Sequence, residues 1–207
     1  GRGEYLEETG HGAMKRPNGV PPDKKQANFT DPDSRIMGTP QVGFVQGYNG
    51  QIAVDAEAQI IVANRITQCA ADSGELLPVT EKAIEIVGRV PKKLLADAGY
   101  KSEQAFVALE ELGVDAHVAL GKGEDGPSRY KHAGPATERM HRKRQTQRSR
   151  HLYKRRKTIV EPVFGWIKAV LGFRSFSLRG LRQVEGEWDL VCLALNLKRM
   201  APRLEWS

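Results

Sequence analysis

The sequence predicts an α/β fold in which a mixed sheet is flanked by helices. Short β-prone runs alternate with segments of helical period, in the order strand, strand, helix, strand, helix, strand. Two longer helical segments then close the chain. With 207 residues, of which 40% are hydrophobic, the chain can bury one core of ordinary size. We therefore expect a single layered domain.

The first ordered elements are expected after a polar N-terminal region. Residues 1–41 are rich in Gly, Pro, Asp and Lys without a sustained period, which predicts an irregular or disordered arm before a core over residues 42–202. The β-prone runs 47–55 and 59–68 follow, separated by three residues. They predict an antiparallel hairpin.

The middle of the chain predicts two helices, each followed by a strand. Asp72 is expected to cap a helix whose apolar residues recur from Leu76 to Val87, and a short apolar strand at 92–96 comes next. Ser102 opens the second helix, which Gly113 closes before a buried strand at 115–120. A parallel component of the sheet follows from this alternation.

The last third of the chain combines a basic connection with two helices. Residues 121–145 are too polar for a core and are predicted to be a mobile connection. A helix is expected over 147–171, with a kink or a new start at Pro162, and another over 181–200. The two cysteines show no metal-ligand spacing and sit among apolar neighbours, which favours buried free thiols.

The positive charge is concentrated in one segment. Of the formal net charge of +7, residues 121–157 contribute thirteen Lys or Arg against three acids, so the remainder is close to neutral. This distribution is typical of a protein that binds a polyanion, although a merely solvated charged loop would look the same. No apolar run is long enough to span a membrane, and no apolar signal core is present.

Two carboxylates stand out as candidate site residues. Asp97 directly follows an apolar strand, where polar side chains of α/β sheets face a ligand, although a turn Asp is also common there. Glu161 lies in a predicted helix whose approach is cationic, and Lys168, two turns later, shares its face. Acids that hold Mg²⁺, beside cations that grip phosphates, are what phosphodiester cleavage requires. The alternative for Glu161 is that it lies on a solvated amphipathic helix without a catalytic role.

Several motifs in order resemble one family. They are GYNGQIAVD, the Asp72 turn, LLADAGYKS, RRKTIVEPVFGWIK and ALNLKRM, which together cover roughly residues 29–202. The chain resembles bacterial insertion-sequence DDE transposases of the branch with a Tyr-Arg-Glu-Lys signature, whose catalytic core is RNase H-like.

The resemblance implies roles for individual residues. Asp97 would be the second catalytic acid and Glu161 the third, and both would hold metal, Mg²⁺ or Mn²⁺. Tyr153, Arg156 and Lys168 would be the signature residues that contact DNA, and the neighbouring Arg155 and Lys157 would add further DNA contacts. The spacing from Arg156 to Glu161 is one residue longer than the usual signature.

The first acid of the family has no counterpart in an apolar strand of this chain. We therefore expect an N-terminally truncated copy that lacks the first catalytic strand, with Asp55 or a partner's acid as the only substitutes. The resemblance also implies double-stranded DNA as partner, a homodimer during synapsis and a place in the bacterial cytosol at the nucleoid. An active enzyme, a truncated remnant that binds DNA without catalysis, and an unrelated basic nucleic-acid-binding protein remain as alternatives.

Overall fold

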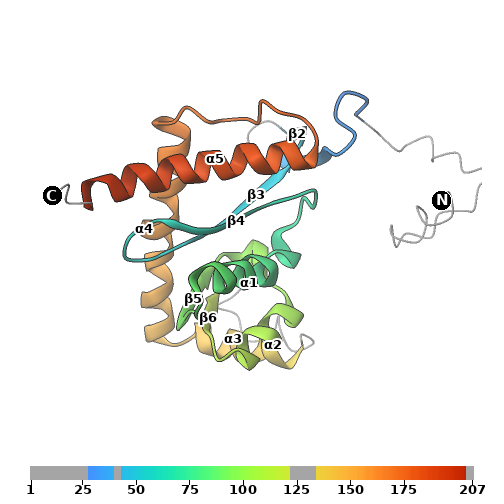
Figure 1. The fold of residues 1–207 in the computed structure, drawn as a ribbon. Coiled ribbons are helices and arrows are strands. Elements are labelled where there is room, and N and C mark those ends of the chain that lie inside the picture. Colours follow the sequence, from blue (N-terminus) through green and yellow to red (C-terminus); the bar gives the residue numbers. More distant parts are fainter. Residues whose placement is uncertain (1–27, 40–42, 122–133, 204–207) are drawn as a thin grey trace, which may run out of the picture.

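The computed structural model describes residues 28–39, 43–121 and 134–203 as a mixed α/β arrangement (Figure 1). The strands in this part of the chain are β1 (Arg35–Thr39), β2 (Gly43–Gly47), β3 (Asn49–Val54), β4 (Ile61–Thr67), β5 (Lys93–Ala96) and β6 (Asp115–Val118). The α-helices are α1 (Leu76–Val87), α2 (Glu103–Glu111), α3 (Pro135–Arg144), α4 (Gln147–Ala169) and α5 (Leu181–Met200). From β3 to β6 the order of elements is the predicted one.

The strands pair in three small sheets and not in one mixed sheet. β1 with β2 and β3 with β4 are antiparallel, whereas β5 with β6 is parallel. The predicted hairpin is therefore confirmed, as is the parallel component. Among the described strands no hydrogen-bonded ladder joins β3 to β5, so each of these two strands keeps an open edge. The expectation of a single sheet is wrong for this reason.

Two segments that we expected to lack regular structure contain elements. β1 lies inside the predicted irregular arm 1–41, where pairing with β2 orders it. α3 lies inside the predicted mobile connection 121–145, and its Ala136 and Met140 are buried in the core. Glu103 of α2 also accepts hydrogen bonds from the backbone N–H groups of Ala136 and Thr137, both at 2.8 Å. These contacts satisfy free N–H groups at the start of α3. Residues 122–133 of the same connection lie outside the described residues.

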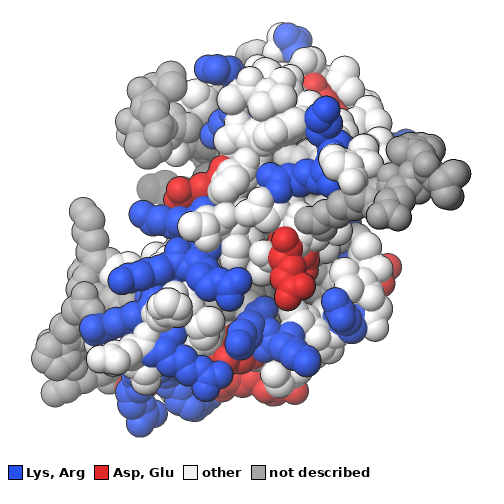
Figure 2. Space-filling model, turned by 90° about the vertical axis from the view of Figure 1, so that its left-hand side faces the viewer, with Lys and Arg blue, Asp and Glu red and all other residues white. Residues whose placement is uncertain are grey.

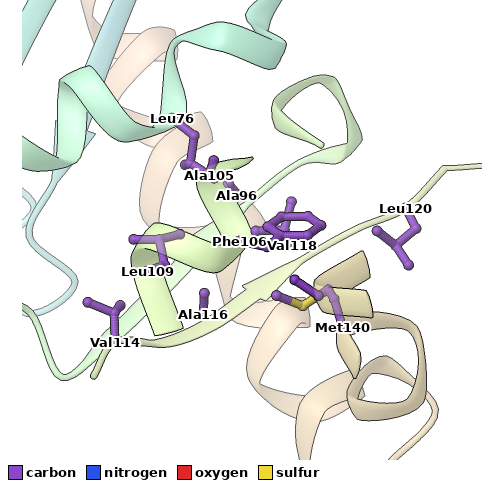
Figure 3. Packing of buried hydrophobic residues seen from close by; sticks show 11 residues of the cluster. Leu76, Ala96, Ala105, Phe106, Leu109, Val114, Ala116, Val118, Leu120 and Met140 are labelled. Atoms are coloured by element: carbon purple, nitrogen blue, oxygen red, sulfur yellow. The ribbon is translucent and has the colours of Figure 1, made fainter. Parts of the chain in front are cut away.

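Two apolar clusters form the core. The first joins β5, β6, α2 and α3 around Phe106 and Leu109, which are 1% and 0% exposed (Figure 3). The second packs α4 and α5 against β3 and β4 around Val163 and Trp188. α4 is one continuous helix through Pro162, so this proline does not mark a new helix start. Because α4 also contacts β5, β6 and α3, it connects the two halves of the molecule.

The two cysteines and the predicted cap at Asp72 have different outcomes. Cys192 is buried, and burial raises the pKa of its thiol to about 11. Cys69 is exposed, so the prediction of a second buried thiol is wrong. Asp72 begins a 3-10 turn and does not cap α1, whose first residue is Leu76. Its carboxylate is used elsewhere, as described below.

Candidate functional site

Asp97 lies in the turn that follows β5, where the sequence places it. Its Oδ1 atom accepts a hydrogen bond from the backbone N–H of Gly99 at 3.0 Å and thereby begins the 3-10 turn Ala98–Tyr100. The side chain is 43% exposed. Strand β5 thus ends by presenting a carboxylate that the backbone orients and solvent can reach.

Asp72 is the unexpected neighbour of Asp97. A Cβ atom on Gly99 would lie 2.8 Å from Asp72 Oδ2 and 3.2 Å from Asp97 Oδ1. Both carboxylates therefore lie close to this glycine. A Cβ atom 2.8 Å from Asp72 Oδ2 would force the Asp72 carboxylate to shift. Glycine at position 99 therefore permits the approach of the two acids.

Asp72 is held by side chains of β3. Its Oδ1 atom accepts hydrogen bonds from Asn49 Nδ2 and Gln51 Nε2, both at 2.7 Å. Gln51 is buried, and its Oε1 atom accepts the hydroxyl of Tyr100. Burial, together with the charges of Asp72 and Asp97, raises the pKa of Tyr100 well above its usual value, so this hydroxyl stays a donor. The network orients Asp72 Oδ1, and no hydrogen bond within the described residues occupies Oδ2.

A cation from α4 completes the surroundings of Asp97. Arg156 Nη1 lies 3.7 Å from Asp97 Oδ2, and the Arg156 side chain is only 18% exposed. The guanidinium lies 5.8 Å from the centre of the Tyr153 ring, while Arg144 lies 4.1 Å from the same ring. Two guanidinium groups therefore lie close to the Tyr153 ring, and such cations are favourable neighbours of an aromatic face. Two of the predicted signature residues, Tyr153 and Arg156, belong to this site.

Glu161 is placed differently from Asp97. It is exposed on α4, and its side chain makes no hydrogen bond or ion pair with any other described residue. Five residues separate it from Arg156, which corresponds to about 140° around the helix axis. Arg156 faces Asp97, so Glu161 lies on another face, together with Lys157 and Lys168, which are also exposed. The structure does not bring Asp97 and Glu161 into contact.

The cations of α4 form an exposed basic face. Figure 2 views the molecule from the α4 side and shows Lys and Arg side chains gathered over the part that contains the first half of the helix. Between positions 142 and 157 the exposed Lys and Arg residues of α3 and α4 are Arg142, Arg148, Arg150, Lys154, Arg155 and Lys157. We refer to these six residues as the basic face. They give the first half of α4 the character of a phosphate-binding surface.

A Ser–His–Asp arrangement near the start of α4 is structural. Ser149 Oγ lies 2.7 Å from His117 Nδ1, and His117 Nε2 lies 3.2 Å from Asp115 Oδ2. Ser149 is 0% exposed and His117 is 2% exposed, so no substrate can reach the hydroxyl. Burial lowers the pKa of His117, and Asp115 opposes that shift. This trio joins β6 to α4 and is not a nucleophilic site.

The acids of the site fit a hard divalent cation in part. Carboxylate oxygens are the ligands that Mg²⁺ prefers. Asp72 and Asp97 offer two carboxylates, which lie close together beside Gly99. In the described ranges no group of three or more His, Cys, Asp or Glu is arranged to hold a metal ion. Two carboxylates and solvent suit Mg²⁺, which keeps several waters in most proteins.

Sequence reasoning missed Asp72 as a member of this site, together with the two side chains of β3 that hold it. Gly99, two residues after the strand-end acid Asp97, was the available signal, because glycine permits a close approach of another group to the backbone. Which residue approaches it depends on the chain between β4 and α1, and no local pattern encodes that placement.

Comparison with protein-family models gives a match to the transposase DDE domain over residues 24–197. The match covers more than half of the chain. The chain belongs to the transposase DDE domain family. Comparisons with curated proteins and with solved structures found no match. The predicted DDE transposase family is thereby confirmed, whereas the Tyr-Arg-Glu-Lys branch and the truncation stay predictions. The mixed α/β elements are consistent with a DDE transposase domain.

The matched region of this DDE domain contains Asp97, Glu161 and the whole of α4. Transposition therefore describes the class of function, and DNA is the substrate that the family implies. None of the described helices is long and apolar enough to cross a membrane.

Proposed function

We propose that this chain is a DNA transposase that cleaves and joins strands at insertion-sequence ends by metal-dependent phosphoryl transfer. The observation that carries the proposal is the carboxylate at the end of β5, which lies beside Asp72 and 3.7 Å from Arg156 of the basic helix α4. An acid that can hold a metal thus meets a surface that can hold a phosphate backbone. Phosphoryl transfer requires both.

The proposed metal sites involve three acids. Asp97 and Glu161 hold Mg²⁺ or Mn²⁺ in this proposal, as the family resemblance implies, and Asp72 is the additional acid that the geometry favours. When bound, such an ion polarises the phosphoryl oxygen and activates the attacking oxygen. The side chains of Tyr153, Arg156 and Lys168 position DNA.

Asp72 is a better substitute for the first acid than Asp55. Asp55 lies in the loop between β3 and β4, where its Oδ2 accepts backbone N–H groups of Glu57 and Ala58 at 3.1 and 2.6 Å. It is therefore engaged in closing a turn. Asp72 instead shares Gly99 with Asp97 and has one oxygen available for a metal.

The open edges of β3 and β5 support an RNase H-like arrangement that takes up one more strand. Each of these strands pairs on one side only among the described residues. Unpaired backbone groups on a strand edge are a template for a further strand. An additional strand between them, from upstream sequence or from a partner, would convert the β3–β4 and β5–β6 pairs into one mixed sheet and could bring a further acid to Asp97.

Strand cleavage on DNA tests the proposal. The protein is incubated with duplexes that carry the element's ends, with Mg²⁺ or Mn²⁺, and nicked products are measured for the wild type, Glu161→Gln and the control Glu111→Gln. Glu111 is an exposed acid on α2, away from the basic face. We expect Glu161→Gln to lose about 10³-fold in cleavage rate with DNA affinity retained, and Glu111→Gln to match the wild type. Folded wild-type protein that binds these ends without nicking them would contradict the catalytic proposal.

A second candidate function is DNA binding without catalysis, as a transposase remnant. The observation that favours it is the lack of a three-member acidic group in the described ranges, together with the basic face. It predicts that binding weakens steeply with salt and that Glu161→Gln changes nothing. In either case we propose a bacterial cytosolic protein at the nucleoid, and synapsis of two ends would require at least a homodimer.

A further inference from the structure

Pro162 leaves one backbone carbonyl of α4 without a helical partner. In an α-helix each N–H donates to the carbonyl four residues earlier, so the carbonyl of Thr158 would accept from residue 162. Proline has no N–H, and its ring also crowds that carbonyl. Because α4 runs without a break from Gln147 to Ala169, the Thr158 carbonyl needs a donor from outside the helix, three residues before Glu161.

Gln59, in the turn between β3 and β4, supplies this donor. Its Nε2 atom donates a hydrogen bond to the Thr158 carbonyl oxygen at 2.9 Å. Its Oε1 atom accepts a hydrogen bond from Arg199 Nη1 of α5 at 2.6 Å. The two partners fix the amide in one orientation, because a reversed amide would place its oxygen against a carbonyl and its NH₂ against a guanidinium. In Figure 1 this turn of the hairpin lies beside α4.

The backbone of Gln59 has a conformation that side chains other than glycine rarely adopt. Among the described residues other than glycine, Gln59 alone has a positive φ, of 55°. Glycine would adopt this left-handed region without steric cost. The turn is nevertheless firmly held, because the Gln59 N–H donates to the Asp55 carbonyl at 2.9 Å and Asn196 of α5 makes two hydrogen bonds to the backbone of Ile61. A strained residue in such a turn indicates that its side chain has a use.

We propose that Gln59 is a positioning residue for Glu161. Its bond to Thr158 holds the turn of α4 from which Glu161 projects, because residues three apart on a helix are surface neighbours with Cβ atoms about 5–6 Å apart. The Glu161 side chain stays exposed, while the backbone beneath it is tied to the hairpin whose strand β3 also provides the side chains that hold Asp72. One hairpin thus links this turn of α4 to the acids beside β5. The inference rests on the proposed function, since it concerns the placement of an acid proposed to hold metal.

Hydrogen exchange of the full chain tests the contact without DNA or metal. Gln59→Met removes the donor and keeps the length of the side chain, so we expect the amides of residues 163–167 to exchange at least about fivefold faster. Gln68→Met is the matched control, because Gln68 Nε2 makes the same kind of bond to the Asp33 carbonyl at 2.6 Å, just beyond the other end of β4. It should leave exchange in α4 unchanged. Wild-type exchange in Gln59→Met would overturn the proposal.

Replacing the proline tests whether Gln59 acts through the carbonyl that Pro162 leaves free. Pro162→Ala restores a backbone N–H that can donate to Thr158, so this turn of the helix no longer needs Gln59. In this background Gln59→Met should change the exchange of residues 163–167 by less than about twofold. An effect of the same size in both backgrounds would contradict the proposed contact.

Strand cleavage separates positioning from a merely structural role. Single-turnover nicking of the element's ends at saturating protein is measured over a range of Mn²⁺ concentrations. Gln59→Met should slow nicking about tenfold and raise the Mn²⁺ concentration that gives half the maximal rate, with DNA affinity unchanged, because the Glu161 carboxylate is misplaced. In the Pro162→Ala background the same change should slow nicking by less than about threefold.

Two outcomes distinguish a failure of this inference from a failure of the proposed function. Faster exchange in Gln59→Met with the wild-type rate and Mn²⁺ dependence of nicking would show that Gln59 does not position Glu161. A wild type that binds the element's ends without nicking them would contradict the proposed function instead. The exchange measurements would then still decide whether Gln59 holds the turn of α4 that carries Glu161.

Discussion

Asp97 and Glu161 are the two acids that the sequence singles out, and their surroundings differ in a way that separates two kinds of placement. Asp97 follows a strand, and both the cation Arg156 of α4 and the second acid Asp72 lie beside the turn that it begins. Glu161 lies on the outer surface of α4, and its side chain has no hydrogen-bond or ion-pair partner in the described part of the chain. The pairing of a strand fixes the position of a side chain at its end. A side chain on an exposed helix surface acquires neighbours only when another molecule or segment packs against that surface.

Contacts within the chain itself orient the acids of the Asp97 site. Asn49 and Gln51 orient Asp72, and Gly99 allows it to approach Asp97. The Glu161 side needs a further element, such as DNA or an additional strand, to acquire partners. Changes at the Asp97 site should therefore act on chemistry, and changes on α4 should act first on DNA binding.

The largest expected effect is from removing the charge at the organised site. Asp97→Asn should lower strand cleavage by about 10³-fold, because one metal-holding carboxylate is lost while the shape stays the same. Cleavage rates and DNA affinity are measured side by side, and affinity should stay within about twofold.

The control for this change is Asp55→Asn. Asp55 is the acid that sequence alone offered as a substitute, but it is engaged in the loop between β3 and β4. Cleavage at the wild-type rate is expected. If Asp55→Asn abolished cleavage and Asp97→Asn did not, the assignment of the site to the turn after β5 would be wrong.

Gly99 offers a narrower change to the same site. Gly99→Ala places a Cβ atom 2.8 Å from Asp72 Oδ2, so the two acids must move apart. A shift of about 1 Å in a catalytic group can cost about 10²-fold in rate, and we expect a loss of that order in cleavage with DNA affinity unchanged. Gly74→Ala, in the neighbouring 3-10 turn, is the control because nothing lies within 4 Å of its Cβ position. Equal activity of both variants would show that the approach of Asp72 has no role.

Substitutions of Arg156 and of its neighbour Arg155 compare the side of α4 that faces Asp97 with another, exposed side. Both changes to Gln remove one positive charge from α4, but only Arg156 faces Asp97. For each variant we expect DNA affinity to fall about fivefold and the salt dependence of log affinity to lose about one phosphate contact. Arg156→Gln should in addition lower the cleavage rate of the bound complex, which single-turnover kinetics at saturating protein measures. A loss of bound-complex rate in Arg155→Gln alone would reverse the proposed orientation of α4.

The elements that could be predicted from the sequence are those that depend on residues close together in the chain. The β3–β4 hairpin, the start of α2 at Ser102 and the end of α2 at Gly113, which has a positive φ, were predicted from turn and cap chemistry within a few residues. The order of elements and the range of α5 followed from hydrophobic period. Asp97 was placed by the strand before it.

The errors concern contacts between distant segments. α3 is strongly polar, and only the burial of Ala136 and Met140 against β6 and α2 makes it part of the core. Asp72 was expected to cap α1, but side chains of β3 hold it instead. No single-sequence pattern reports that β3 passes the turn after β4, or that the strands separate into three sheets. The proposed binding of metal by both Asp97 and Glu161 depends on such distant packing and stays a prediction.

The smallest expected effect concerns a histidine beneath α4 and depends on pH. Burial lowers the pKa of His117 in the folded protein below that of the unfolded chain, so the unfolded state binds more protons in acid. The free energy of unfolding should therefore fall as the pH drops through the unfolded pKa of about 6.5. Urea unfolding at about pH 7.5 and about pH 5.5 measures this, and His117→Gln should show a smaller drop than the wild type. His151→Gln, at an exposed position of α4, should keep the wild-type drop. If His151→Gln removed the drop and His117→Gln kept it, the assignment of the drop to His117 would be wrong.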